Sequence, residues 1–273
     1  MNAHRSPKLR LRTHGWLVLF AALAVSSSLP VRANRSPQEP ATQLQAEIEK
    51  QKARLNAAET EDRRDAVLRL GALHRTEASR AAVPALSDAS PIVRVTAAAA
   101  VSSLPVDEGV SVLKPLLSDK DPFVRQEVAY ALGNFRSQNA VPLLVERLRS
   151  DKVSGVRGAA AVALGMIGDE TAVLPLAQLF SLGKKKSENE FVVRAAAHSL
   201  GQIRSRSAVP PLIAALANDS LPQDVRREAA QSLGLIGDPS AIPALQTASS
   251  DNDPHLSRIA VEALRRIATR KPT

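Results

Sequence analysis

Residues 156–165 read Val-Arg-Gly-Ala-Ala-Ala-Val-Ala-Leu-Gly, and variants of this pattern return along most of the chain. The position of the late leucine recurs at intervals of 31 to 36 residues. It is occupied by Leu70, Val101, Leu132, Leu164, Leu200, Leu233 and Leu264. A short unit that occurs seven times predicts a stack of similar repeats, each of which buries its apolar side against its neighbours.

An arginine stands seven residues before the leucine position in five of the seven units. These arginines are Arg63, Arg94, Arg125, Arg157 and Arg226. In the other two units Val193 and Ser257 occupy this arginine position, and Arg194 and Arg258 follow one place later. Because the arginines lie next to an apolar position and at a fixed distance from an aspartate, a structural role is favoured over an anion-binding row.

A second kind of segment alternates with the first, with proline near its start and aspartate after its end, as in Pro115 and Asp119. Proline is tolerated in the first turn of a helix, and aspartate caps the next helix by accepting its free amide hydrogens. Apolar residues in the arginine-bearing segments are three and four places apart, and no segment alternates with a period of two. Each unit is therefore predicted to be a pair of helices, and the fold to be all-α.

The repeats are predicted to occupy residues 61–271. Before them, Leu44, Ile48 and Leu55 share one face of a helix predicted within residues 41–60, which would cap the N-terminal end of the array. Residues 34–40 are polar and rich in proline, so they are expected to form a short linker.

The first 33 residues have the organisation of a signal peptide. Four basic residues precede the apolar run 16–25, and Val31 and Ala33 place small residues at positions −3 and −1 of a cleavage site before Asn34. The apolar run is shorter than the roughly 20 residues that span a bilayer. We therefore expect a periplasmic or secreted protein with no stable membrane anchor after cleavage.

Composition limits the possible partners. The net charge is +9, but five of the 36 basic residues lie in residues 1–33, which contain no acid. The rest of the chain has 31 basic and 27 acidic residues of alternating sign, so charge by itself does not indicate a nucleic-acid partner. Aromatic residues make up only 3% of the chain, which favours closely packed helices over a thick globular core.

Proline in one helix, aspartate in the turn and Val-Arg in the next helix, as in Pro142, Asp151, Val156 and Arg157, resemble the HEAT repeat. The short unit with Leu-Gly resembles the bilin-lyase (PBS lyase) variant of that repeat. The resemblance implies a right-handed α-solenoid, a HEAT-like superhelix of about seven helix pairs, that binds other proteins as a scaffold. It also implies a ladder of aspartates and arginines between repeats, with the pairs Asp88–Arg94, Asp119–Arg125, Asp151–Arg157 and Asp251–Arg258.

Catalysis, metal binding and a cofactor are not expected. After cleavage the histidines are His74, His198 and His255, and no two of them have a helical spacing that suits a metal. The chain lacks the His-Glu dipeptides of HEAT-like iron hydroxylases, and bilin attachment does not suit an exported protein. The Gly-x-x-Gly runs at 165–168 and 234–237 lack the features of a phosphate loop and are interpreted as helix ends.

The arginine-bearing helices are expected to present one face for recognition. Residues two, five and nine places after the arginine position would lie on this face, which lines the inner curve in the family that the chain resembles. Tyr130, Val162 and Met166 would form an apolar patch flanked by polar residues. The predicted partner-binding residues are Glu127, Tyr130, Asn134, Val162, Met166, His198, Gln202 and Gln231.

The sequence thus predicts an exported HEAT-like scaffold whose concave face binds a protein or peptide. Two alternatives stay open. One is a solenoid that binds nucleic acid, to which the basic loop at Lys184, Lys185 and Lys186 would contribute, although export and the absence of any tryptophan after Trp16 weigh against it. The other is a non-catalytic repeat module that supports an enzyme in a complex.

Overall fold

The computed structural model describes residues 38–181 and 188–269. Residues 40–273 form one compact unit. The predicted signal peptide, most of the predicted linker and the lysines at 184–186 lie outside the described residues. Within them all regular structure is helical, which confirms the all-α prediction, and no described helix is long and apolar enough to cross a membrane.

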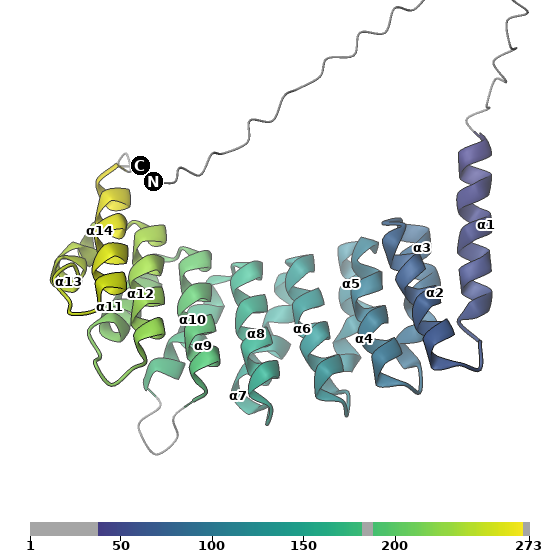
Figure 1. The fold of residues 1–273 in the computed structure, drawn as a ribbon, viewed down its shortest axis with the longest axis horizontal. Coiled ribbons are helices and arrows are strands. Elements are labelled where there is room, and N and C mark those ends of the chain that lie inside the picture. Colours follow the sequence, from purple (N-terminus) through teal and green to yellow (C-terminus); the bar gives the residue numbers. More distant parts are fainter. Residues whose placement is uncertain (1–37, 182–187, 270–273) are drawn as a thin grey trace, which may run out of the picture. The chain divides into compact units, whose positions relative to one another are not determined.

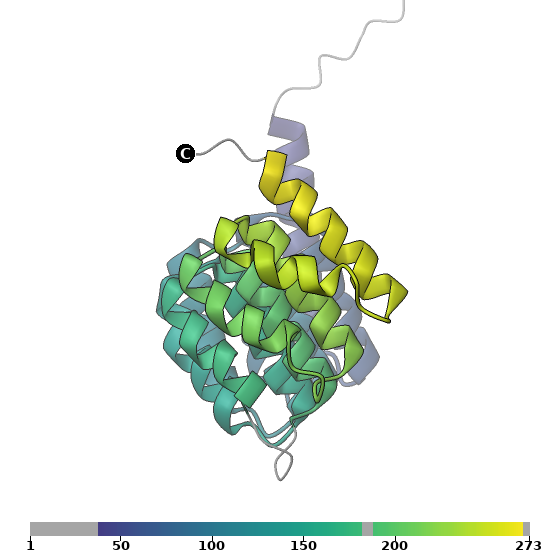
Figure 2. The same cartoon turned by 90° about the vertical axis from the view of Figure 1, so that its left-hand side faces the viewer.

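The helices form two rows (Figure 1). One row contains the arginine-bearing helices, α2 (Thr60–Ala72), α4 (Pro91–Ala100), α6 (Pro122–Phe135), α8 (Ser154–Ile167), α10 (Glu190–Ile203), α12 (Gln223–Ile236) and α14 (Pro254–Thr269). The other contains the proline-bearing helices, α3 (Thr76–Ala82), α5 (Val106–Leu113), α7 (Val141–Ser150), α9 (Val173–Ala177), α11 (Val209–Leu216) and α13 (Ile242–Ala248). Seen from the C-terminal end of the rows, α14 lies nearest the viewer and the earlier repeats lie behind it (Figure 2).

The core runs between the two rows. The leucine position is fully buried in every arginine-bearing helix up to α12, and the proline-bearing helices contribute buried leucines such as Leu144 and Leu212. Leu264 of α14 is only half-buried, because no helix of the described chain packs beyond α14. Each repeat therefore buries its apolar side against the next one, as the recurring pattern predicts.

The proline-bearing segments are less regular than predicted. Pro84 and Pro115 lie within 3-10 segments, η1 (Val83–Ser87) and η3 (Lys114–Ser118), that follow α3 and α5 directly. A proline inside a helix lacks an N–H and clashes with the preceding turn, so the α-helix ends there and continues in the tighter form. Only in the later repeats, as at Pro142 and Pro210, does the proline stand in the first turn of an α-helix.

The helix before the repeats, α1 (Gln38–Arg54), begins inside the predicted linker and ends earlier than the expected residue 60. Ile48 is buried, and Leu44 and Leu55 pack against the core. Arg54 of α1 donates a hydrogen bond of 2.7 Å to Asp65 of α2 and pairs with Asp62 at 3.2 Å. The helix therefore covers the N-terminal end of the array through the apolar face that the sequence predicts.

Neighbouring arginine-bearing helices approach each other through the glycine that follows the leucine position. A Cβ atom added to Gly133 would lie 2.8 Å from the Cα atom of Ala163, and one added to Gly234 would lie 2.8 Å from the Cα atom of Ala263. Real Cβ contacts are never this short, so these positions require glycine for close packing. In the last helix, α14, Arg265 occupies the equivalent position and is exposed.

The glycines at the ends of the same runs have a different role. Gly168 and Gly237 have left-handed backbones, with φ of 77° and 75°, and end α8 and α12. This conformation is free of strain for glycine and terminates helices well. The interpretation of these runs as helix ends is therefore correct for the second glycine, whereas Gly165 and Gly234 lie inside their helices.

Candidate functional site

A ladder of ion pairs joins consecutive repeats along the edge where the arginine-bearing helices begin. Arg125 shows its geometry: Nε and Nη2 donate to the two carboxylate oxygens of Asp151 at 2.7 and 2.9 Å, and Nη1 donates to the carbonyl oxygen of Asp119 at 2.8 Å. Each such arginine ties the turn of its own repeat to the turn of the next repeat. The pairs are Arg63–Asp88, Arg94–Asp119, Arg125–Asp151, Arg157–Glu188 and Arg226–Asp251.

The ladder exists as predicted, but the predicted partners are wrong. Arg94, Arg125 and Arg157 contact the aspartate of their own turn only through its main-chain carbonyl oxygen. Their guanidinium groups extend to the carboxylate of the following repeat, because the aspartate of their own turn already faces the preceding arginine. Asp251 accordingly pairs with Arg226, and Arg258 is exposed.

The aspartates of the turns also differ from the predicted helix caps. The Asp88 carboxylate accepts a hydrogen bond of 2.8 Å from the backbone N–H of Ser90, and it is Ser90 that precedes the first residue of α4. Asp119, Asp151 and Asp251 accept in the same way from the residue two places on. Asp121, which accepts from the N–H groups of Phe123 and Val124, and Asp253, which precedes α14 and accepts from the N–H group of His255, are true caps. The turn aspartates therefore fix the loop that receives the arginine.

One junction lacks a ladder pair. Val193 occupies the arginine position of α10 and is buried, and the displaced Arg194 is exposed. Asp219, in the following turn, leaves 88% of its side chain exposed and pairs at 3.2 Å with Arg226 of its own repeat. Among the described residues, no ion pair from the arginine position joins α10 to α12, which makes this the least constrained junction of the ladder.

The ladder predicts how stability depends on pH. Burial raises the pKa of Asp119 and Asp151, but the arginine and backbone hydrogen bonds outweigh it, so the pKa of each is lowered. Outside the ladder, the Arg227 hydrogen bond holds the pKa of Asp253 at about 2. A carboxyl whose pKa is lower in the folded chain contributes stability that is present above its unfolded pKa of about 4 and is lost as the pH falls through the folded value.

We therefore expect the free energy of unfolding to be nearly constant between about pH 7 and pH 5 and to fall below about pH 4, as the unfolded carboxyls take up protons first. Urea titrations at a series of pH values would measure this. Stability that stays constant or rises down to about pH 2 would contradict the assigned role of the ladder carboxylates.

The face of the arginine-bearing helices that points away from the proline-bearing row, here called the open face, contains the predicted binding residues. Asn134, Gln202 and Gln231 are exposed on it. Glu127, Tyr130, Val162, Met166 and His198 are half-buried. Burial raises the pKa of the Glu127 carboxyl above its ordinary value. All eight predicted residues thus lie at the surface in the structure, but five of them are also partly covered by neighbouring groups.

Three apolar residues of the open face were missed in the sequence. Phe123 is 71% exposed, Phe191 42% and Ile92 41%. Each lies two places before the arginine position and seven before the position already singled out, and residues seven apart share a helix face. This spacing is the signal that could have found them. Phe191 also lies across Gly158 of α8, where no side chain larger than hydrogen would fit beneath its ring.

Polar groups join α10 to α12 on the same face. His198 Nδ1 lies 2.9 Å from the Glu228 carboxylate, and its Nε2 lies 3.0 Å from the Gln202 amide nitrogen. These contacts bring together two of the predicted binding residues. No group of three metal-ligating side chains occurs among the residues that the structure describes.

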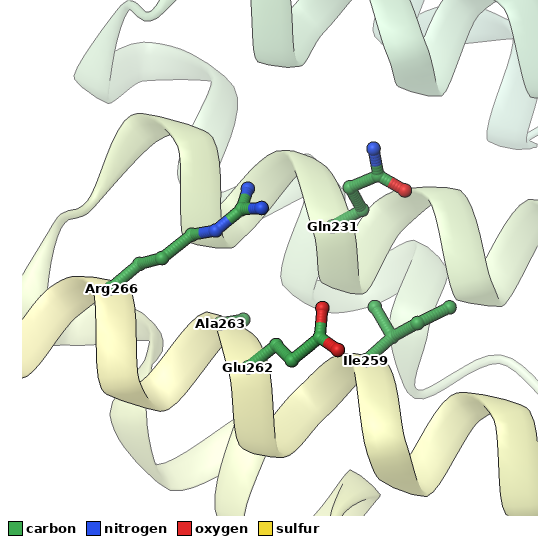
Figure 3. Close-up of a pocket in the computed structure, with 5 residues that line it drawn as sticks. All are labelled: Gln231, Ile259, Glu262, Ala263 and Arg266. Carbon is green, nitrogen blue, oxygen red and sulfur yellow. The ribbon is translucent and has the colours of Figure 1, made fainter.

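The open face is hollowed between α12 and α14. Gln231 of α12 and Ile259, Glu262, Ala263 and Arg266 of α14 line a pocket of about 100 Å³. Figure 3 shows the Glu262 carboxylate and the Arg266 guanidinium extending from α14 toward the helix that carries Gln231. Gln231 is one of the predicted binding residues, whereas Glu262 and Arg266 are not among them.

Comparison with protein families matches HEAT repeats to residues 79–165, 110–185, 156–223 and 209–273. No curated protein matches the sequence. The complex of CpcE and CpcF of phycocyanin lyase from Nostoc sp. PCC7120 is a similar solved structure, with 22% identity, 92% of this chain and 95% of that chain covered, and a TM-score of 0.51.

Two further solved structures are similar. An engineered protein has 23% identity, coverage of 82% of this chain and 69% of that chain, and a TM-score of 0.52. Human deoxyhypusine hydroxylase in complex with glycerol has 21% identity, coverage of 85% and 100%, and a TM-score of 0.38. For the two structures with TM-scores above 0.5, the likeness concerns the fold alone.

Proposed function

The chain belongs to the HEAT-repeat family, and from that premise we propose that it is a scaffold that binds a protein or peptide on its open face. The observation that carries the proposal is the apolar stripe of α4, α6, α8 and α10, defined by Ile92, Phe123, Tyr130, Val162 and Phe191. Phe123 exposes 71% of its surface, in a chain with few aromatic residues. An exposed apolar stripe of this kind is typical of a surface that another macromolecule covers.

The charge pattern supports a partner with apolar side chains. On α6 and α8 the positions two before and two, five and nine after the arginine position carry one charged residue, the half-buried Glu127. The flanking helices α2 and α12 carry charged residues at such positions, for example Asp65 and Asp224. An apolar centre with a polar rim is the usual anatomy of a protein interface.

The packing supports the inner curve as the location of this face. Within residues 40–273 the arginine-bearing helices contact one another extensively, whereas the proline-bearing helices contact one another little. A stack that is packed more closely on one side bends toward that side. The open face would then be the concave face on which the sequence analysis places the partner.

A nucleic-acid partner is less favoured because the ladder arginines are engaged. Arg94, Arg125 and Arg157 each direct the guanidinium group to a carboxylate, with side chains at most 18% exposed. Phosphate contacts need basic groups that are free to reach the backbone of the nucleic acid. We propose a non-catalytic role, either as a scaffold alone or as a module that supports an enzyme in a complex.

Binding through the apolar stripe predicts that Phe123→Ala weakens association with the partner about thirtyfold, which corresponds to the ~2 kcal/mol of an interface hot spot, without a change in the urea midpoint. Wild-type and variant proteins spanning Asn34 to Thr273 would be immobilised, and partner recovery from an envelope extract and then affinity would be compared. Leu174→Ala is the matched control, because Leu174 is 66% exposed but belongs to α9 of the other row. Equal binding by Phe123→Ala and wild type would rule out the apolar stripe as the surface that binds the partner.

We also propose export to the periplasm or the medium, on the basis of the ordered basic, apolar and small-residue regions of residues 1–33. The intact mass of protein purified from the cell envelope should correspond to a chain that begins at Asn34. A cytosolic species that retains Met1 would contradict this proposal.

A further inference from the structure

The pocket between α12 and α14 contains three polar side chains that lack partners. Among the described residues, the side chains of Gln231, Glu262 and Arg266 form no hydrogen bond or ion pair with one another or with other groups. Their neighbours differ: Arg227 pairs with Asp224 and Asp253, and Arg226 pairs with Asp251. Three unpartnered groups of different chemistry therefore converge on one small space (Figure 3).

The three groups define the chemistry of a ligand. The planar guanidinium of Arg266 matches a carboxylate, to which it can donate two parallel hydrogen bonds. The Glu262 carboxylate only accepts, so it suits an N–H group, and the Gln231 amide can both donate and accept. Ile259 and Ala263 provide an apolar wall. A ligand that matches this set carries a carboxylate and an N–H close together beside a small apolar group.

Size and charge narrow the choice further. A volume of about 100 Å³ is enough for one small residue. Glu262 would repel a doubly charged phosphate more strongly than a singly charged carboxylate that lies on Arg266, and Arg266 would repel a free amine. Arg258 and Arg265 of the same helix are exposed and without ion-pair partners among the described residues, so α14 attracts anionic groups.

We propose that this pocket binds the C-terminal residue of a peptide, with Arg266 on the terminal carboxylate, Glu262 on the backbone N–H of that residue and a small side chain against Ile259. This inference rests on the proposed function, since it identifies which part of a protein partner the open face recognises at its C-terminal end. The apolar stripe then holds the preceding part of the partner.

The test uses N-acetyl-L-alanine as the probe, with the protein spanning Asn34 to Thr273. We expect it to shift the side-chain amide resonances of Gln231 in a saturable way. N-acetyl-L-alaninamide, which lacks the carboxylate, should bind at least tenfold more weakly, and so should acetate, which lacks the N–H. Equal binding of the amide would overturn the proposal, as would an absence of saturable shifts. Equal binding of acetate would reduce the pocket to a general anion site and would also overturn it.

Two variants link the shifts to the pocket. Arg266→Gln removes the charge and shortens the side chain but keeps a polar amide, so it should weaken the binding of N-acetyl-L-alanine at least tenfold while circular dichroism shows unchanged helix. Arg265→Gln, the adjacent exposed arginine outside the pocket, should bind as wild type. Equal loss in both variants would indicate a diffuse charge effect and would contradict a site at Arg266.

Failure of this inference is distinguishable from failure of the proposed function. Phe123→Ala should leave binding of N-acetyl-L-alanine unchanged, because Phe123 belongs to α6 and lies outside the pocket lining. If Phe123→Ala weakens binding of the partner but N-acetyl-L-alanine does not bind, only the peptide-binding pocket is wrong. If N-acetyl-L-alanine binds but Phe123→Ala leaves partner affinity unchanged, the apolar stripe is not the surface that binds the partner.

Discussion

Arg125→Ala is expected to lower the free energy of unfolding by about 3 to 5 kcal/mol, the range observed when one partner of a buried ion pair is removed. The Asp151 side chain is only 2% exposed and would lose both of its hydrogen bonds from the guanidinium group. The carbonyl oxygen of Asp119 would lose its donor as well. The urea midpoint, measured with an unchanged slope, reports this loss.

Arg194→Ala is the matched control for this prediction. Arg194 belongs to the repeat in which the arginine is displaced by one place, and it is exposed. Its removal should leave the urea midpoint unchanged. If the two variants were equally stable, the ladder would contribute no net stability and would only determine how the repeats are aligned.

Gly133→Ala is expected to destabilise the protein by about 1 to 2 kcal/mol, although alanine forms helices better than glycine by up to about 1 kcal/mol. The new Cβ atom would lie 2.8 Å from the Cα atom of Ala163, so α6 and α8 would have to move apart. Because the conflict is with backbone atoms, no side-chain rotation can relieve it.

The control is Gly155→Ala in α8. Its Cβ atom would meet only the Oε1 atom of Gln126 at 2.9 Å, and that atom ends a flexible side chain that can turn away. We expect the urea midpoint of this variant to stay the same or to rise. A stable Gly133→Ala variant would show that the helix rows can separate without loss of packing.

The repeats, the all-α fold and the capping helix were predictable from the sequence, because each depends on local periodicity that is present in single segments. The partners in the ladder were not. The distance in sequence between Arg94 and Asp88 is short, but the guanidinium group contacts Asp88 only at its main-chain carbonyl oxygen. Its carboxylate partner is Asp119, and only the stacking of repeats brings these two side chains together.

The position of residues on the open face could be predicted in part for the same reason. Helical spacing placed Tyr130 and Gln231 on the open face, but it did not reveal that Tyr130 is half-buried or that Arg266 turns toward α12. The burial of Tyr130 and the direction of Arg266 depend on how closely neighbouring helices approach each other. That distance is determined jointly by a glycine in one repeat and an alanine in the next. Phe123 is therefore a cleaner probe of binding than Tyr130.

The arginine that replaces glycine in the last helix has a consequence for self-association. A repeat surface that accepts a neighbour on one side can in principle accept a second molecule there, and a head-to-tail contact that does not close produces filaments. In α14, the last helix that the structure describes, this contact position holds the exposed Arg265. A second molecule could approach α14 as closely as α8 approaches α6 only by displacing this long charged side chain, so the arginine disfavours a head-to-tail contact at this face.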